Sequence, residues 1–169
     1  MAHHGVGRSV VYHAQTEEIS PIDGNRLLED WLAGGDDLIP QWSILPTEES
    51  MSQVASLHAD GRVRSARLSD TSGTGLPFRP WAFHDLLSWL AESRIPIWIP
   101  LSDVDPHELV STLSVYPKLM TVLVGAHYSH ALLVRPILKA LPNAHLELSR
   151  YEPIGEIESL CDTFGAERL

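Results

Sequence analysis

The stretch "LMTVLVGAHYSHALLVRPILKALPNAHLELS", residues 119–149, decides the fold. A run of branched apolar residues predicts a buried strand over 119–125, and the apolar spacing of 130–141 predicts a helix that Pro136 interrupts or delays. A second strand is predicted over 143–149. A strand, a helix and a strand joined this closely predict two parallel strands connected by a right-handed crossover.

The same alternation continues in both directions along the chain. Further strands are predicted over 9–13, 39–46, 63–69 and 95–101, and further helices over 25–33, 49–59, 81–94, 105–116 and 154–169. Six strand–helix units predict an α/β fold with a parallel sheet, either a closed barrel or an open doubly wound sheet. No glycine-rich phosphate-binding motif follows the first strand, which favours the (β/α) barrel. Such barrels have eight units, so the chain holds about six of them.

Length and composition narrow the class of protein. The 169 residues predict a single domain over 1–169, a partial barrel on the count above. A formal charge of −10 repels phosphate backbones, so no nucleic acid partner is expected. No apolar run approaches the roughly 18 residues that a membrane span needs. We therefore expect no membrane partner and a cytoplasmic location.

Candidate site residues follow the ends of the predicted strands, where barrel enzymes place their chemistry. His127 closes the strand over 119–125 and is a candidate metal ligand, with a polar strand–helix junction as the alternative. His13 closes the first strand and is the second candidate to converge with His127; a histidine that only bonds a loop fits equally well. Asp70 heads a glycine-rich loop and is a candidate ligand or general base. Arg150 and Tyr151 could bind an acidic substrate group at the rim.

Other polar residues have structural interpretations. Asp103 or Asp105 is expected to cap the helix over 105–116. Alternation along 143–149 places Glu147 on the inner side of a barrel, where Arg67 is its expected partner. The tryptophans are expected mostly in the core.

Eight segments, in order, resemble the amidohydrolase-related, metal-dependent hydrolases of TIM-barrel fold. The segments are "HGVGRSVVYHA", "SPIDGNRLLEDWL", "DLIPQWSILP", "VRSARLS", "IPIWIPL", "YPKLMTVLVGAHY", "RPILKALPNAHLELS" and "FGAERL". The resemblance implies that the six strands are barrel strands two to seven. The family's H-x-H strand would then lie before Met1 and its aspartate-bearing strand after Leu169.

Within the chain, the resemblance implies a histidine at the end of "IPIWIPLSD", where Pro100, Leu101 and Ser102 stand instead. His127 is the counterpart of the sixth-strand histidine. The family chemistry needs about three protein ligands for its metal. We therefore expect a divalent metal such as zinc in an intact homologue and none in this chain.

The resemblance implies a hydrolase, or decarboxylase, that acts on a small carboxylate-bearing substrate and is inactive as this partial or degenerate chain. The alternative is a non-catalytic barrel relative that binds a small molecule or a protein partner. In either case the open edges of the first and last strands predict a homo-oligomer.

Overall fold

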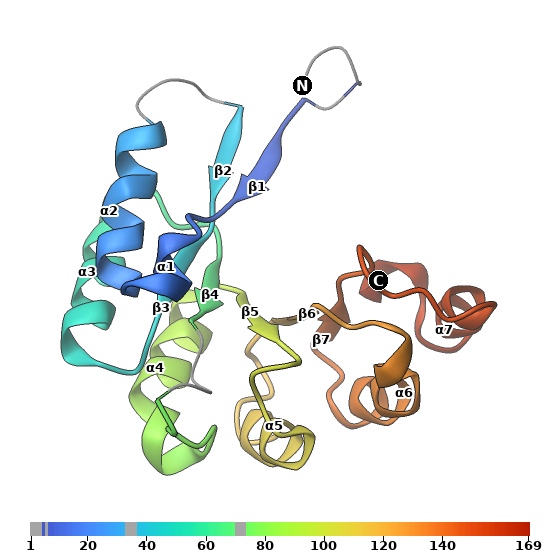
Figure 1. Cartoon of the computed structure of the whole chain (residues 1–169). Helices are drawn as coiled ribbons and strands as arrows, with labels where there is room; N and C mark the ends of the chain where they lie inside the picture. Colours follow the sequence, from blue (N-terminus) through green and yellow to red (C-terminus); the bar gives the residue numbers. More distant parts are fainter. Residues whose placement is uncertain (1–4, 6, 33–36, 70–73) are drawn as a thin grey trace. The chain divides into compact units, whose positions relative to one another are not determined.

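The computed structural model describes residue 5 and residues 7–32, 37–69 and 74–169. The chain forms two compact units, Met1–Ser69 (unit 1) and Asp70–Leu169 (unit 2), drawn from blue to green and from green to red in Figure 1. Every strand pairing described within each unit is parallel. The predicted α/β fold with parallel strands is therefore confirmed.

The strands of unit 1 form two parallel pairs. Its elements are β1 (Ser9–Val11), α1 (Gln15–Glu18), α2 (Pro21–Leu32), β2 (Leu38–Pro40), β3 (Trp42–Ile44), α3 (Glu48–Ala59) and β4 (Ala66–Leu68). The strand predicted over 39–46 is divided at Gln41, so that β2 pairs with β1 and β3 pairs with β4. Gln41 N–H still donates to Val11 O at 2.8 Å, which carries the β1 pairing one residue further.

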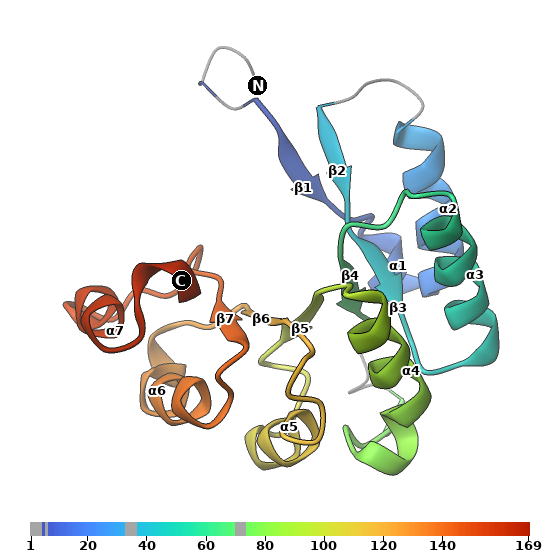
Figure 2. The same ribbon diagram turned by 180° about the vertical axis from the view of Figure 1, so that it is seen from behind.

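Helices α2 and α3 lie on one side of β3 (Figures 1 and 2). Their apolar residues Leu28 and Val54 are buried, as are Trp42 and Ile44 of β3. Burial of these large side chains supplies the main stabilising contribution to unit 1, because the hydrophobic effect scales with the apolar area removed from water.

The segment "SPIDG", which reads as a turn in the sequence, is the first turn of α2. Ser20 Oγ accepts the N–H of Asp23 at 3.1 Å and donates to the Asp23 carboxylate at 2.7 Å, which caps the helix before Pro21. Position 24, inside the helix, is occupied by glycine because a Cβ there would lie 2.8 Å from the Cα of Thr16. The short helix α1 that brings Thr16 to this point was not predicted.

Unit 2 follows the predicted order of elements, with shorter strands. It contains α4 (Pro80–Ser93), β5 (Ile97–Pro100), α5 (Pro106–Leu113), β6 (Thr121–Val124), η2 (Tyr128–His130), α6 (Ala131–Ala140), β7 (Ala144–Leu146), α7 (Glu156–Phe164) and η3 (Ala166–Arg168). Asp105 caps α5, accepting from the N–H groups of His107 and Glu108 at 2.9 and 3.0 Å. Helix α6 continues through Pro136 without a break.

The strands β5, β6 and β7 have two different faces. Ile97, Ile99, Leu123 and Leu146 are buried on one face, and Figure 1 shows α5 and α6 on one side of these strands. The other face carries Trp98, Val122 and His145, which are register partners across the three strands and are only half-buried. This second face corresponds to the interior of a barrel.

A side chain covers one strand edge in each unit. In unit 1, Asn25 of α2 accepts from Ser43 N–H at 3.0 Å and donates to Ser43 O at 2.8 Å, on the edge of β3 away from β4. In unit 2, the Arg168 guanidinium donates to Ala144 O at 2.6 Å, on the edge of β7 away from β6. Covered edges resist pairing with other chains. The homo-oligomer predicted through the edges of the first and last strands stays a prediction.

Two tryptophans depart from the expectation of burial. Trp31 and Trp81 are 65% and 73% exposed, because each lies on the outward side of its helix, whereas Trp42 is fully buried. Among the described helices, none is both long and apolar enough to cross a membrane.

Candidate functional site

His127 lies just past the carboxyl end of β6. Gly125 turns the chain with φ of +71°, a left-handed conformation that glycine adopts without strain. Ala126 is fully buried, and His127 then caps η2, which leads into α6. The sequence thus delivers a half-buried imidazole to the strand end where barrel enzymes place their chemistry.

His130 completes a pair of imidazoles with His127. The backbone N–H of His127 donates to His130 Nδ1 at 3.2 Å, and the N–H of Ser129 donates to His127 Nδ1 at 3.5 Å. The two ring centroids are 4.7 Å apart, with the rings at 78° to each other. Tyr128 is 69% exposed beside the pair.

These hydrogen bonds do not fit a metal ion on the two rings. An Nδ1 that accepts a hydrogen bond leaves the proton of a neutral imidazole on Nε2. A histidine that binds a metal through Nε2 instead donates from Nδ1 to a neighbouring acceptor. Within the described ranges, no three histidine, cysteine or acidic side chains lie close enough to hold a metal ion. Each ring of the pair therefore carries an Nε2–H, and Ser129 Oγ lies 3.5 Å from Nε2 of His127.

The carboxyl end of β5 has a different character. Pro100 and Leu101 are buried, and Ser102 Oγ donates to the Asp103 carboxylate at 2.6 Å. Asp105 is engaged as the cap of α5. The two carboxylates that follow this strand thus have structural partners.

His13 follows β1 in unit 1. Its Nδ1 accepts from Gln15 N–H at 3.3 Å, and its carbonyl accepts from the Thr16 hydroxyl at 2.8 Å. The ring meets the exposed Trp31 edge to face, with centroids 4.9 Å apart. These contacts hold the start of α1; convergence of His13 with His127 stays a prediction.

The remaining candidates are placed differently from one another. Asp70 lies outside the described residues. Arg150 is exposed, whereas Tyr151 is 2% exposed and its hydroxyl is buried without a hydrogen-bond partner in the described part of the chain. Burial raises the pKa of the Tyr151 hydroxyl, Glu156 raises it further, and Arg135 lowers it. Their role at a substrate rim stays a prediction.

Arg67 and Glu147 lie in different units, each with a partner in its own unit, and their expected pairing stays a prediction. Arg67 Nη2 lies 3.5 Å from Glu17 Oε1, and its guanidinium lies over the Tyr12 ring, 4.4 Å from the centroid. Glu147 Oε1 accepts from the N–H of Ser149 at 2.7 Å, two residues along the chain. Strand alternation predicts the face on which Glu147 lies, but it does not predict this local hydrogen bond.

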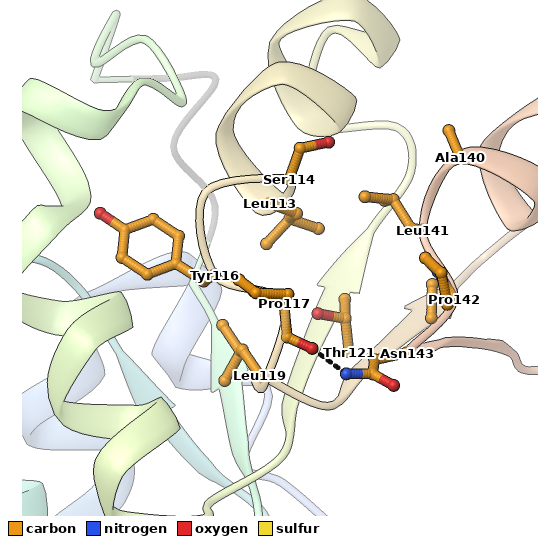
Figure 3. A pocket seen from close by; sticks show the side chains of 11 residues that line it. Leu113, Ser114, Tyr116, Pro117, Leu119, Thr121, Ala140, Leu141, Pro142 and Asn143 are labelled. Atoms are coloured by element: carbon orange, nitrogen blue, oxygen red, sulfur yellow. Dashed lines mark hydrogen bonds between the residues drawn. The ribbon is translucent and has the colours of Figure 1, made fainter.

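A hollow of about 120 Å³ in unit 2 lies at the other ends of the strands (Figure 3). It is lined by the first residues of β6 and β7, Thr121 and Ala144, and by Leu113, Leu119 and Leu141. The side-chain amide of Asn143 donates to the Pro117 carbonyl at its edge. Because His127 follows the carboxyl end of β6, the hollow and the imidazole pair lie at opposite ends of that strand.

Sequence reasoning missed a group of polar side chains in unit 1. Gln41 and Ser43 are 2% and 1% exposed, and the Gln41 Nε2 and Ser43 Oγ atoms are buried without a hydrogen-bond partner among the described residues. Ser43 is the register partner of Arg67. The signal was present in "IPQWSILP", whose polar residues at 41 and 43 alternate with apolar ones and so share one face.

Comparisons with known proteins bear on the fold. No protein-family profile matches the sequence, and no curated protein matches it. A TIM-barrel protein from Bordetella bronchiseptica, Bb4693, described as uncharacterized, is similar in structure, with a TM-score of 0.76 at 18% identity over 99% of this chain.

The chain has a TIM-barrel-like fold. Amidohydrolase 2 from Bifidobacterium longum subsp. infantis is also similar, with a TM-score of 0.60 at 16% identity over 99% of this chain. At these identities the two likenesses show the fold alone. The chain spans 65% and 66% of the lengths of the two proteins.

Proposed function

We propose that the protein hydrolyses or decarboxylates a small carboxylate-bearing compound, with His127 in contact with the reacting atoms. The observation that carries this proposal is the pair of imidazoles at the carboxyl end of β6, whose Nδ1 atoms are bonded to backbone N–H groups. The likeness of the fold to a protein named Amidohydrolase 2 supports the reaction class.

Negative charge develops in both reactions, and the pair supplies hydrogen-bond donors that stabilise it. Hydrolysis delivers a proton to the leaving group, and decarboxylation replaces carbon dioxide with a proton on carbon. A neutral His127 ring whose Nδ1 accepts from Ser129 carries its proton on Nε2, where it donates a hydrogen bond to the atom on which negative charge develops, while water supplies the proton that is transferred. His130, fixed by the His127 N–H, places a second donor beside it. Because the rings do not fit a metal, the proposal assigns the stabilisation of this charge to the imidazoles alone.

The test is turnover of a panel of small esters, amides and carboxylates, followed by mass spectrometry. His127→Ala is expected to lower kcat/KM roughly 100-fold on any compound that wild type consumes, the usual contribution of one hydrogen-bond donor to developing negative charge. His84→Ala is the matched control: His84 lies on α4, and its Nδ1 is 3.0 Å from the Tyr116 hydroxyl, near the amino end of β6. A rate unchanged by His127→Ala, or a panel left intact by wild type, contradicts the proposal.

A second candidate function is binding without turnover. The observation that favours it is the carboxyl end of β5, which is closed by the buried apolar Pro100 and Leu101 where the family resemblance implies a histidine. A compound that raises the melting temperature but is recovered unchanged after incubation would favour this second function, and its consumption would favour the first.

A further inference from the structure

Three polar side chains of unit 1 share the sheet face opposite Trp42 and Ile44. Gln41 directly precedes β3, Ser43 lies two residues further along on β3, and Arg67 is the register partner of Ser43 on β4. Side chains at such positions stand roughly 6.6 Å apart along a strand and roughly 4.8 Å apart across neighbouring strands. Gln41, Ser43 and Arg67 therefore form one cluster, the donor patch.

The donor patch contains two buried donors in need of an acceptor. Gln41 is 2% exposed and Ser43 1%, and neither Gln41 Nε2 nor Ser43 Oγ has a hydrogen-bond partner in the described part of the chain. An unpaired buried polar group costs about 1–3 kcal/mol. Two such groups side by side could each gain a hydrogen bond from a further molecule with acceptor atoms.

Arg67 lies over the other two residues. Tyr12 directly follows β1, and the N–H of Gln41 pairs with Val11 O, so Tyr12 stands on the side of Gln41 that faces away from β4. The Arg67 guanidinium lies 4.4 Å from the Tyr12 ring centroid. From its position on β4 it must cross the face of β3, over Gln41 and Ser43. A guanidinium has donors and no acceptor, so it cannot satisfy Gln41 Nε2, and it makes no hydrogen bond to Ser43 Oγ among the described residues.

The charge of Arg67 is only loosely balanced. Glu17 Oε1 lies 3.5 Å from Arg67 Nη2, longer than the 2.7–2.9 Å of a strong charged hydrogen bond. The Glu17 side chain is 44% exposed and the Arg67 side chain 14%, so the carboxylate lies on the solvent side of the guanidinium. A stronger anionic partner can displace Glu17 into water at little cost.

We propose that the donor patch binds the carboxylate of a small organic acid. A carboxylate has two oxygens with about four acceptor positions and no donor. It can accept from the Gln41 amide, the Ser43 hydroxyl and the Arg67 guanidinium together, and Arg67 supplies the opposite charge. This site lies within unit 1 and does not rest on the proposed reaction, since a binding protein and an enzyme could use it equally.

The probe is succinate, with succinamide as its uncharged analogue of similar size, titrated into the full chain by calorimetry. Succinate is expected to bind at least ten times more tightly than succinamide. Arg67→Met and Ser43→Ala are each expected to weaken succinate binding roughly tenfold, the effect of losing a hydrogen bond to a charged group. Arg64→Met removes an exposed guanidinium of the same unit and is expected to leave binding unchanged.

Ser43→Ala keeps the test decisive if Arg67→Met does not fold. It deletes a hydroxyl that has no partner within the described chain, so the melting temperature is expected to stay within a few degrees of wild type. The proposal is overturned if succinate does not bind, which is the result for a patch filled by ordered water alone. Equal affinity for succinate and succinamide, or a folded Ser43→Ala that binds as wild type does, also overturns it.

Discussion

Units 1 and 2 each use a side chain where a neighbouring strand would otherwise bond, but the two side chains differ in kind. Asn25 has a donor and an acceptor, so it satisfies both Ser43 N–H and Ser43 O. Arg168 has donors only, and it collects three carbonyls, those of Leu138, Leu141 and Ala144. A neutral amide thus replaces a strand, whereas a guanidinium caps the end of α6 and the start of β7. On this edge of β3, the N–H and the carbonyl of Ser43 therefore both depend on a single side chain, that of Asn25.

The largest effect is expected from Asn25→Ala. The change leaves Ser43 N–H and Ser43 O unpaired in a buried position, and it also removes the donor to Gln53 Oε1 at 2.9 Å. We expect a loss of roughly 3 kcal/mol in the free energy of unfolding, measured by urea denaturation. Arg26→Ala, at the exposed neighbouring position, is the control and is expected to cost less than about 1 kcal/mol. A loss below 1 kcal/mol for Asn25→Ala would break the comparison.

Arg168→Met is expected to cost less, about 2 kcal/mol. The methionine keeps part of the side-chain packing but leaves the three carbonyls to find water, which is easier for a half-buried site than for Ser43. Burial lowers the pKa of the Arg168 guanidinium, but the group stays charged at neutral pH. Urea denaturation checks the value, with the exposed Arg150→Met as control. A loss of unfolding free energy equal to that of Asn25→Ala would show that the two side chains, Asn25 and Arg168, do not differ in how much each strand edge depends on them.

The smallest effect concerns the pH dependence of unit 2. Burial, with Glu156, raises the pKa of Tyr151 above its ordinary 10.0. Below pH 10 the hydroxyl is protonated in both the folded and the unfolded chain, so its contribution to stability is fully present. Above pH 10 the unfolded chain loses the proton first, and this contribution is lost as pH rises through the raised folded pKa.

Tyr151→Phe isolates this contribution. The variant is expected to match wild type at pH 7, because it deletes a hydroxyl without a hydrogen-bond partner in the described chain, and to lose less stability between pH 9 and pH 11. The measurement is urea denaturation across that pH range. Parallel pH profiles for the two proteins would show that Tyr151 does not titrate differently on folding.

The order of strands and helices was predictable because apolar periodicity reports which faces are buried. Strand lengths were not, because a partner change at Gln41 divides the second strand and pairing ends early elsewhere. The start of α2 was missed although Ser20, Pro21 and Asp23 form a recognisable cap. Gly24 reads as a turn residue until its contact with Thr16 is seen, and that contact depends on tertiary structure.

The candidate site was predictable in position and not in chemistry. The strand pattern placed His127 at the carboxyl end of β6, as the structure has it. The bonding of its Nδ1, and that of His130, depends on local backbone geometry after Gly125, which no spacing rule gives. For the donor patch, the alternation in "IPQWSILP" predicts only that Gln41 and Ser43 share one face. Whether their side chains find hydrogen-bond partners depends on tertiary structure.

The most direct test of the account is the long-range ¹H–¹⁵N correlation spectrum of the histidine rings in the ¹⁵N-labelled chain, with His127→Gln and His130→Gln to assign them. It reports which ring nitrogen carries the proton. The account predicts the Nε2–H form for both His127 and His130 above pH 7, unchanged by added zinc. An Nδ1–H form for either ring, or a shift of both on addition of zinc, would contradict the claim that this pair is a hydrogen-bond donor pair.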